Sequence, residues 1–426
     1  MNEVSEKTLK YRRRWFIFWV LAAQYLLSYF HRIAPAVVAP ELVKTFNISG
    51  ASLGLLASAY LYSYTIMQIP VGIFSDSLGP RKTITIFSLI AAAGSVLFGL
   101  SPDYIAAVAS RVLIGLGVSA VFVATMKVFS EWFTGEEHAR VSGMLMSVGG
   151  IGWLSATTPL AFLTLMLGWR ESFVLVGLFA LALTIVTWFV VSDSPGREGP
   201  LRTGEEITSR KKNNGAIDNI RIVFKEKHFW AIAIWFFFRG GALLGFFGLW
   251  AGPYIIDVYK LSKQTTGNIL AMIAFAMIFL SPVLGHLSDK TLMSRKKVLV
   301  GASLLNSLCW LVMLVFYDSM SIPALYAVFF IMGVTISSVG ILAIVTTKEF
   351  FPPEIAGTAM GSINVFPFIG GIVFQPLIGW ILDKSGKFQG TYEPSAYLSI
   401  IWLLFVTSIV ALISIMFSEE TFNRNY

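Results

Sequence analysis

Apolar residues occur along the chain in runs of roughly 20, and short polar segments separate these runs. A run of this length crosses the hydrocarbon core of a bilayer as a helix, whereas the strands of a membrane barrel are shorter and alternate in polarity. The pattern therefore predicts an all-α integral membrane protein with twelve transmembrane helices. The predicted spans lie near residues 15–38, 51–74, 83–100, 104–127, 140–165, 171–191, 229–252, 265–287, 296–317, 322–347, 355–381 and 394–417.

The composition supports the same class. Of the 426 residues, 56% are hydrophobic and 13% are charged, and the mean hydropathy is +0.72. Soluble proteins carry about 25% charged residues, so a water-soluble fold could not hide this much apolar surface. The net charge of +8 does not indicate a nucleic-acid partner, because the basic residues lie in short loops. The single cysteine, Cys309, can form neither an intrachain disulfide nor a thiolate zinc site.

The basic residues also predict the orientation in the membrane. Of the 32 Lys and Arg, 23 lie in segments on the side that holds both termini and six lie on the other side. Because cytoplasmic loops are enriched in Lys and Arg, both termini are expected in the cytoplasm, with the protein in an inner or plasma membrane. The remaining three, Arg32, Arg111 and Arg239, lie within predicted spans.

The two halves of the chain resemble each other at a nearly fixed offset. Gly54, Gly72 and Asp76 are matched 213 residues later by Gly267, Gly285 and Asp289, while the offset is 218 for Glu131 with Glu349 and for Gly143 with Gly361. Such a repeat indicates duplication of a six-helix unit, an arrangement typical of secondary transporters, whose cargo site lies between the repeats. We expect a first half at 1–192, a cytoplasmic linker at 193–228 and a second half at 229–426. Within the linker region, residues 216–230 are expected to form a short interfacial helix.

Related polar loops follow the second and eighth spans. The first reads GIFSDSLGPRK, in which Gly72 lets helices approach closely and Gly79 permits a tight turn. Asp76 is expected where a helix from the other half begins, so that its charge faces the positive end of that helix. Arg81 is expected to hold this loop at the anionic inner leaflet. The second, GHLSDKTLMSRK, contains Asp289 and Arg295 but lacks the turn glycine.

These loops resemble the signature loop of the major facilitator superfamily. The resemblance covers the whole chain and includes RVLIGLGVSA at 111–120, WRESF at 169–173 and FQPLIGWILD at 374–383. It implies twelve helices in two pseudo-symmetric halves, alternating access, and a gating role for the loop residues Gly72, Asp76, Gly79, Arg81, Asp289 and Arg295. Arg111 belongs to the fourth-span motif, for which we expect a structural or proton-linkage role.

A narrower resemblance concerns the first span, SYFHRIAPAVVAPEL. It is similar to the first helix of organophosphate:phosphate antiporters and related organic-anion carriers, which place an arginine here and another in span seven to bind the anionic group. Arg32 and Arg239 are the corresponding residues, although Arg239 lies earlier in its span than the resemblance implies.

The residues themselves also point to an anionic ligand. Burying a lone arginine in a span costs at least about 2.5–3.5 kcal/mol, and the acidic residues of the spans lie near helix ends. A guanidinium suits carboxylate or phosphate in a bidentate mode. Helical spacing places further polar candidates on spans one, two and eleven, with packing as the alternative role for the aromatic ones. These candidates are Tyr25, Tyr29, Tyr64, Gln68 and Asn364.

Two further residues of span one bear on mechanism. His31 is a proton-coupling candidate because imidazole titrates near neutral pH, although a packed neutral histidine is the alternative. Pro35 has no backbone N–H, so it frees the carbonyl of residue 31 and is expected to kink the helix there.

We therefore expect a secondary transporter for a small organic anion bearing carboxylate or phosphate, coupled to protons and monomeric. Alternatives are an amino acid or short-peptide transporter, which needs an acid near the site for the amine, and a non-transporting membrane sensor. The chain lacks a P-loop, a metal-ligand cluster and a nucleophile–base arrangement, so no enzyme activity, cofactor, metal or nucleic-acid partner is expected. The run GGALLG at 240–245 lies inside a predicted span and is expected to be a packing surface.

Overall fold

The structure of the protein is a computed structural model that describes residues 3–133, 135–194, 216–336, 340–388 and 391–422. It divides into two compact units, one of residues 1–48 and 55–203 and one of residues 49–54 and 204–426. Most of the expected linker, residues 195–215, lies outside the described residues. The expected domain boundaries stay a prediction.

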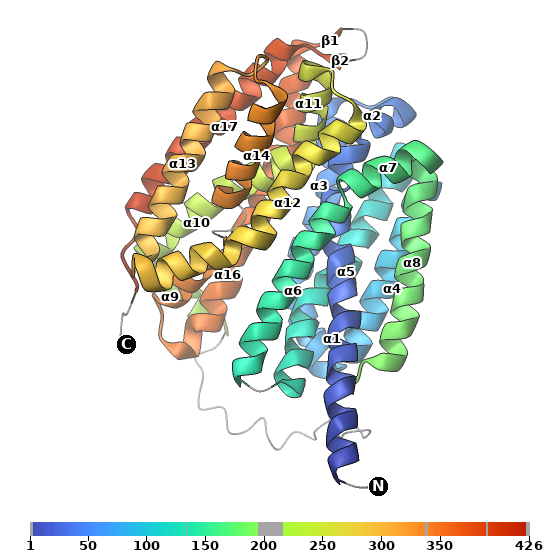
Figure 1. The fold of residues 1–426 in the computed structure, drawn as a ribbon, viewed down its shortest axis with the longest axis vertical. Helices are drawn as coiled ribbons and strands as arrows, with labels where there is room; N and C mark the ends of the chain where they lie inside the picture. Colours follow the sequence, from blue (N-terminus) through green and yellow to red (C-terminus); the bar gives the residue numbers. More distant parts are fainter. Residues whose placement is uncertain (1–2, 134, 195–215, 337–339, 389–390, 423–426) are drawn as a thin grey trace. The chain divides into compact units, whose positions relative to one another are not determined.

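The first unit consists of helices that run back and forth along one another (Figure 1). Helix α4 packs along both α5 and α8, while α1 packs against α6. The helices are α1 (Glu3–Ile33), α2 (Pro35–Phe46), α3 (Gly50–Ser77), α4 (Pro80–Leu100), α5 (Tyr104–Trp132), α6 (Gly135–Ser155), α7 (Thr158–Leu167) and α8 (Trp169–Val190). The first residues of α3 group with the second unit.

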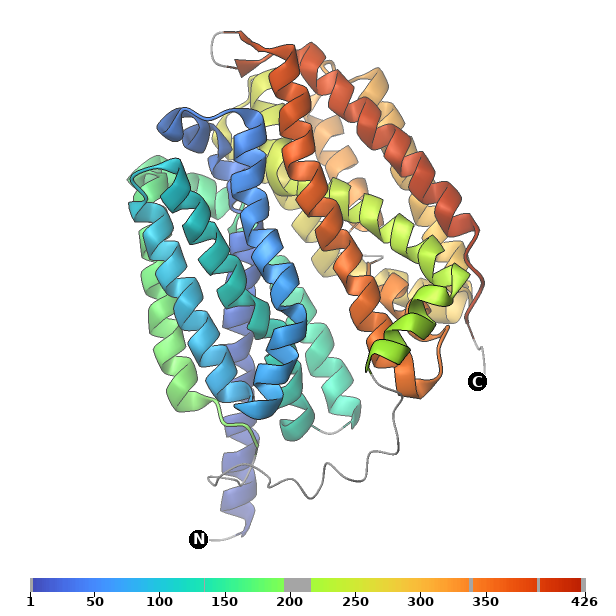
Figure 2. The same cartoon turned by 180° about the vertical axis from the view of Figure 1, so that it is seen from behind.

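The second unit is also helical, and Figure 2 shows α16 and α10 lying side by side in it. Its elements are α9 (Ala216–Lys225), α10 (Lys227–Gly240), the π-helix η1 (Gly241–Trp250), α11 (Ala251–Tyr259), α12 (Lys263–His286), the π-helix η2 (Leu287–Thr291), α13 (Arg295–Val315), α14 (Ile322–Ile336), α15 (Gly340–Lys348), α16 (Pro353–Ser385), β1 (Lys387–Phe388), β2 (Thr391–Tyr392) and α17 (Pro394–Met416). The strands are antiparallel, with Lys387 opposite Tyr392. The sequence pattern did not predict this hairpin or the π-helices, but the short helix expected ahead of span seven is present as α9.

Each of the twelve predicted spans coincides with helix in the described residues. Nine helical segments there are long and apolar enough to cross a membrane, and α14 is a shorter apolar helix. Helices α1 and α3 are not among the nine. Both carry polar and aromatic residues of the candidate site, including Arg32 and Gln68, which lower the local hydropathy.

Two of the helix starts illustrate capping by short polar side chains in the loops. Asp103 accepts a hydrogen bond from the backbone N–H of Ala106 at 2.8 Å, and Ser262 accepts one from Thr265 at 3.1 Å. These side chains occupy the N-cap positions of α5 and α12. An N-cap oxygen satisfies an amide that has no partner within the helix, which fixes where each helix begins.

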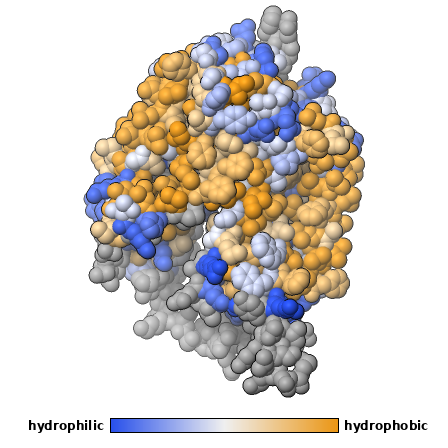
Figure 3. All heavy atoms as spheres, in the orientation of Figure 1, coloured by the Kyte–Doolittle hydropathy of each residue, from blue (hydrophilic) through white to orange (hydrophobic). Residues whose placement is uncertain are grey.

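The outer surface of the helices is apolar, as expected of a protein that lipid surrounds. Large side chains remain exposed along the flanks, including Phe189 at 76% on α8 and Trp402 at 51% on α17. Figure 3 shows apolar side chains covering most of the visible face, with hydrophilic ones gathered near helix ends. An exposed apolar area of this extent marks a surface that water does not cover.

The second unit depends on a close approach between α10, η1 and α16. A Cβ atom added to Gly370 would lie 2.1 Å from the carbonyl oxygen of Phe237 and 2.6 Å from the backbone nitrogen of Gly241. Only glycine permits backbones to approach this closely. The run at 240–245 is therefore a packing surface, as predicted.

Gly370→Ala should lower the stability of the protein by about 1–3 kcal/mol, because its methyl group would have to displace backbone atoms. Thermal unfolding of the purified protein in detergent measures the effect. Gly361→Ala is the matched control on the same helix, since its Cβ would meet no described atom within 4 Å. Equal melting temperatures for the two variants would contradict the packing role of Gly370.

Candidate functional site

Arg32 lies among tyrosine rings in the first unit. The central carbon of its guanidinium is 4.6 Å from the ring centroid of Tyr29 and 5.1 Å from that of Tyr64. The Tyr25 hydroxyl lies 3.3 Å from that of Tyr29, one helical turn away. The structure thus brings together four of the residues selected from helical spacing, and the aromatic faces stabilise the cation.

Two further residues of α3, Tyr60 and the candidate Gln68, lie near this group. The ring of Tyr60 stacks on that of Tyr64 at 6.0 Å, and its hydroxyl donates to the carbonyl of Ser28 at 3.1 Å. The Gln68 amide donates to the carbonyl of Tyr64 in its own helix at 3.4 Å. Tyr60 therefore links α3 to α1, while Gln68 is half-buried one turn beyond Tyr64.

Arg111 binds the backbone carbonyl of His31, which the sequence predicted to be freed by Pro35 without predicting its partner. Helix α1 ends at Ile33 and α2 begins at Pro35, so the expected break occurs where the proline cannot donate to the carbonyl of His31. The guanidinium of Arg111 donates to this carbonyl at 2.9 Å. A buried carbonyl without a partner costs about 1–3 kcal/mol, so the contact stabilises the broken helix.

His31 itself is buried, with an exposed fraction of 1%. Neither ring nitrogen has a hydrogen-bond partner among the described residues. Its ring centroid lies 5.5 Å from that of Phe30 and 6.4 Å from that of Phe173. The imidazole therefore sits in an aromatic pocket of the first unit.

Arg239 is the buried arginine of the second unit. It lies on α10 with an exposed fraction of 4%, and its guanidinium carbon is 5.0 Å from the ring of Trp235. Its Nε and Nη2 atoms are buried and have no hydrogen-bond partner within the described ranges. Asn364 is half-buried on α16, which packs along α10. For the part of the chain that the structure describes, no hydrogen bond joins Asn364 to Arg239.

The polar loop of the first unit is held from within that unit. Gly79 has φ +84°, a conformation that favours glycine, which confirms the predicted turn. The backbone N–H of Arg81 donates to the Asp193 carboxylate at 2.7 Å, and Asp76 forms an ion pair with Lys127 at 2.6 Å. Sequence reasoning missed Asp193, because no local spacing connects it to residue 81.

One expectation about this loop differs from the structure. The sequence suggested that Gly72 permits close helix packing, but a Cβ there would meet no described atom within 4 Å. The expectation that Arg81 holds this loop at the inner leaflet stays a prediction; its guanidinium lies 4.5 Å from the ring of Trp188. Packing against an aromatic ring keeps the charge partly covered at the helix end.

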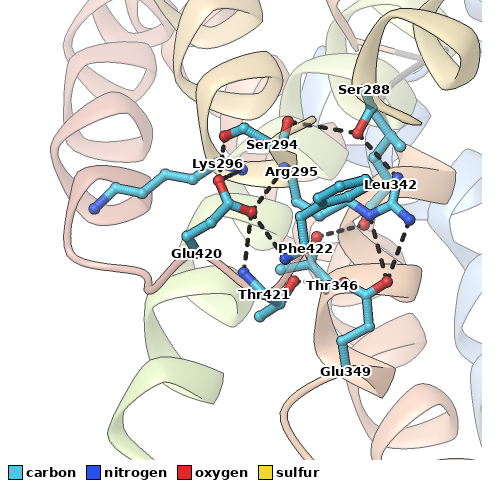
Figure 4. A network of polar contacts seen from close by, with 10 residues as sticks. All are labelled: Ser288, Ser294, Arg295, Lys296, Leu342, Thr346, Glu349, Glu420, Thr421 and Phe422. Carbon is cyan, nitrogen blue, oxygen red and sulfur yellow. Dashed lines mark hydrogen bonds and ion pairs between the residues drawn. The ribbon is translucent and has the colours of Figure 1, made fainter. Parts of the chain in front are cut away.

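The corresponding loop of the second unit has a different construction. Met293 adopts φ +44° near the place of the missing glycine, after the π-helix η2. Arg295 donates to Glu349 at 3.2 Å and to the hydroxyl of Ser288 at 3.0 Å (Figure 4). The side chain of Asp289 lies outside what the structure describes.

The residues after α17 complete this network, as Figure 4 shows. Glu420 accepts hydrogen bonds from the hydroxyl of Ser294 and from the backbone N–H of Arg295 at 2.9 Å, and the hydroxyl of Thr421 donates to Glu349 at 2.5 Å. Burial opposes ionisation of Glu420, but these hydrogen bonds hold the pKa of its carboxyl below the usual range. Glu420 therefore caps α13 from a distant part of the chain.

Glu420→Gln should lower the stability of the protein at neutral pH by about 1 kcal/mol, the typical contribution of a helix cap. Thermal unfolding in detergent measures this, with Glu131→Gln, an exposed glutamate in the last turn of α5, as control. Because a depressed pKa stabilises the fold above the ordinary carboxyl pKa of about 4.3, the difference from wild type should be constant down to that pH. It should shrink as the pH falls through the lower pKa of folded Glu420. If the stability difference between wild type and Glu420→Gln instead grew as the pH fell, the capping role of Glu420 would be contradicted.

Arg111→Leu should cost more stability in the wild-type background than in a Pro35→Ala background. Alanine at position 35 restores a backbone N–H that can donate to the His31 carbonyl, so this carbonyl depends less on the guanidinium. A double-mutant cycle of unfolding free energies should give a coupling of about 1 kcal/mol. Strictly additive effects would show that Arg111 does not compensate for the proline.

Comparison with known proteins agrees with this architecture. The sequence profile of the Major Facilitator Superfamily matches residues 21–374 and residues 244–424. A probable sulfoacetate transporter of Cupriavidus necator is 24% identical over 392 residues, which are 89% of this chain and 89% of that protein. The hexuronate transporter of Bacillus subtilis is 24% identical and covers 86% of this chain and 87% of its own. The D-galactonate transporter of Escherichia coli O6:H1 is 24% identical, with coverages of 94% and 96%.

Solved structures with the same fold include transporters. A D-xylose-proton symporter has a TM-score of 0.78 at 15% identity, covering 96% of this chain and 99% of that one. A bacterial homologue of the human lysosomal transporter Spinster has a TM-score of 0.72 at 17% identity, with coverages of 95% and 96%. The chain therefore belongs to the Major Facilitator Superfamily and is a multi-pass membrane transporter of that family.

Proposed function

We propose that this transporter carries a small organic anion, most simply a carboxylate, by secondary active transport with alternating access. In this proposal Arg32 and Arg239 each contact the acid group of the cargo during the transport cycle. The tyrosines around Arg32 and the amides of Gln68 and Asn364 contribute hydrogen bonds to the rest of the solute.

The observation that carries the proposal is the burial of Arg239 together with its unused hydrogen-bond donors. Its guanidinium is buried on a helix long and apolar enough to cross a membrane, and two of its nitrogens have no hydrogen-bond partner in the described part of the chain. A buried cation with unused donors is costly unless a ligand satisfies it. A carboxylate accepts two parallel N–H bonds from one guanidinium and neutralises its charge.

The surroundings of Arg32 support the same chemistry. Tyr29 and Tyr64 lie against its guanidinium with their ring faces, which stabilise the cation but leave it positively charged. Tyrosine hydroxyls can donate to a carboxylate or to the hydroxyls of a sugar acid. A positive site with many hydroxyl partners suits polyhydroxy acids, and the named cargoes of the relatives include hexuronate and galactonate.

Proton symport would supply the driving force. Moving one negative charge inward against a negative-inside potential costs about 2.3 kcal/mol per 100 mV. A proton carried together with the anion makes the transported pair neutral and removes this cost. In this proposal His31 is the candidate proton carrier, since neither of its ring nitrogens is engaged in a hydrogen bond among the described residues.

Topology and gating complete the proposal. The excess of Lys and Arg on one side supports cytoplasmic termini, and a monomer is the simplest functional form. The loops around Asp76 and Arg295 would stabilise one closed state of the cycle. In the first unit the ion pair of Asp76 with Lys127 would set the position of its loop.

Purified protein in liposomes tests the proposed cargo. A panel of labelled sugar acids, short carboxylates, organophosphates and peptides, with and without an inward proton gradient, should show uptake of one or more carboxylates that the gradient stimulates. Arg32→Ala and Arg239→Ala should each reduce this uptake by at least about tenfold, because one charged hydrogen-bonded contact contributes about 1.5–3 kcal/mol. Arg221→Ala is the control, since Arg221 is an exposed arginine on α9.

Two outcomes would contradict the proposal. Either alanine variant could retain wild-type uptake of the anion while remaining monodisperse, which would remove that arginine from the site. Alternatively, the panel could show uptake of a neutral or cationic solute only.

A further inference from the structure

A groove in the first unit is separate from the candidate cargo site. It has a volume of about 700 Å³ and lies where α4 ends and α8 begins. Its lining includes Gly99, Ser101, Arg170, Glu171, Leu175 and Leu178. Most of this wall is apolar, and Leu175 and Leu178 are 49% and 52% exposed on the outer face of α8. The groove therefore opens on the surface that lipid covers.

Arg170 is fixed at the end of this groove. Its Nη1 atom donates to the carbonyl of Gly99 at 3.1 Å and to that of Ser101 at 2.6 Å. The guanidinium also lies 4.6 Å from the ring of Trp169. These contacts hold the side chain in one position, and its Nε and Nη2 atoms make no hydrogen bond to any described residue. A fixed guanidinium with unused donors is a suitable partner for a phosphate.

Glu171 is the next residue and carries the opposite charge. Its side chain is exposed and forms neither an ion pair nor a hydrogen bond within the described ranges. It lies in the first turn of α8, so it is at the same depth as Arg170. The polar end of the groove thus presents one cationic side chain, Arg170, and one anionic side chain, Glu171, next to apolar walls.

We infer that this groove binds a phospholipid with a primary ammonium headgroup, such as phosphatidylethanolamine. The phosphate would accept from Arg170, the ammonium would donate to Glu171, and an acyl chain would lie along Leu175 and Leu178. An anionic headgroup would meet the Glu171 carboxylate unfavourably. A choline headgroup has no N–H, so it could not donate a hydrogen bond to the carboxylate.

Lipid titration of the purified full-length protein, read by native mass spectrometry, tests this inference. Phosphatidylethanolamine should be retained more strongly than phosphatidylcholine with the same acyl chains. Glu171→Gln should reduce this preference by about threefold, which corresponds to the loss of one exposed ion pair. The control is Glu393→Gln, because Glu393 is also an exposed carboxylate but does not line the groove.

A charge-reversal variant separates the inference from a loss of folding. Glu171→Lys should acquire a preference for the anionic phosphatidylglycerol while keeping the melting temperature of the wild type. The inference is overturned if wild type binds the ethanolamine and choline lipids equally, or if Glu171→Gln keeps the wild-type preference. It is also overturned if Glu393→Gln loses the preference to the same extent.

Discussion

A polar group buried among membrane helices has no bulk water to bind, so the chain or a ligand must satisfy it. This constraint explains the contacts of the three arginines within the spans. Arg111 satisfies the carbonyl that Pro35 leaves free, and tyrosine rings cover Arg32. Arg239 keeps buried N–H donors for which the described residues offer no acceptor. In our proposal an anionic cargo accepts hydrogen bonds from these donors.

Patterns that repeat along the chain could be read from the sequence alone. Apolar runs predicted helix at twelve positions, and the described residues are helical at each of them, because a helix in lipid needs a long apolar run whatever its neighbours are. The spacing of Tyr25, Tyr29 and Arg32 predicted a shared face, since residues three or four apart in a helix are adjacent. Gly79 predicted its turn because few other residues adopt a positive φ.

Contacts between distant segments could not be read in this way. Asp193 holds the loop of Arg81, and Glu420 caps α13, but no periodicity connects the members of either pair. The π-helix η1 begins at Gly241, which packs closely on Phe374 of α16, and no local sequence pattern indicated this contact. The proline break was predicted, but its guanidinium partner lies 80 residues away, on α5.

Recognition of the negative charge of the cargo is the central claim, and a competition measurement tests it most directly. Binding of labelled D-galactonate, or of the best sugar acid found, to the purified protein is measured against the unlabelled acid and against its neutral amide of the same shape. If buried guanidiniums bind the carboxylate, the acid displaces the label at a concentration at least about 100-fold lower than the amide, because a paired buried charge is worth several kcal/mol. Equal competition by acid and amide would contradict the account.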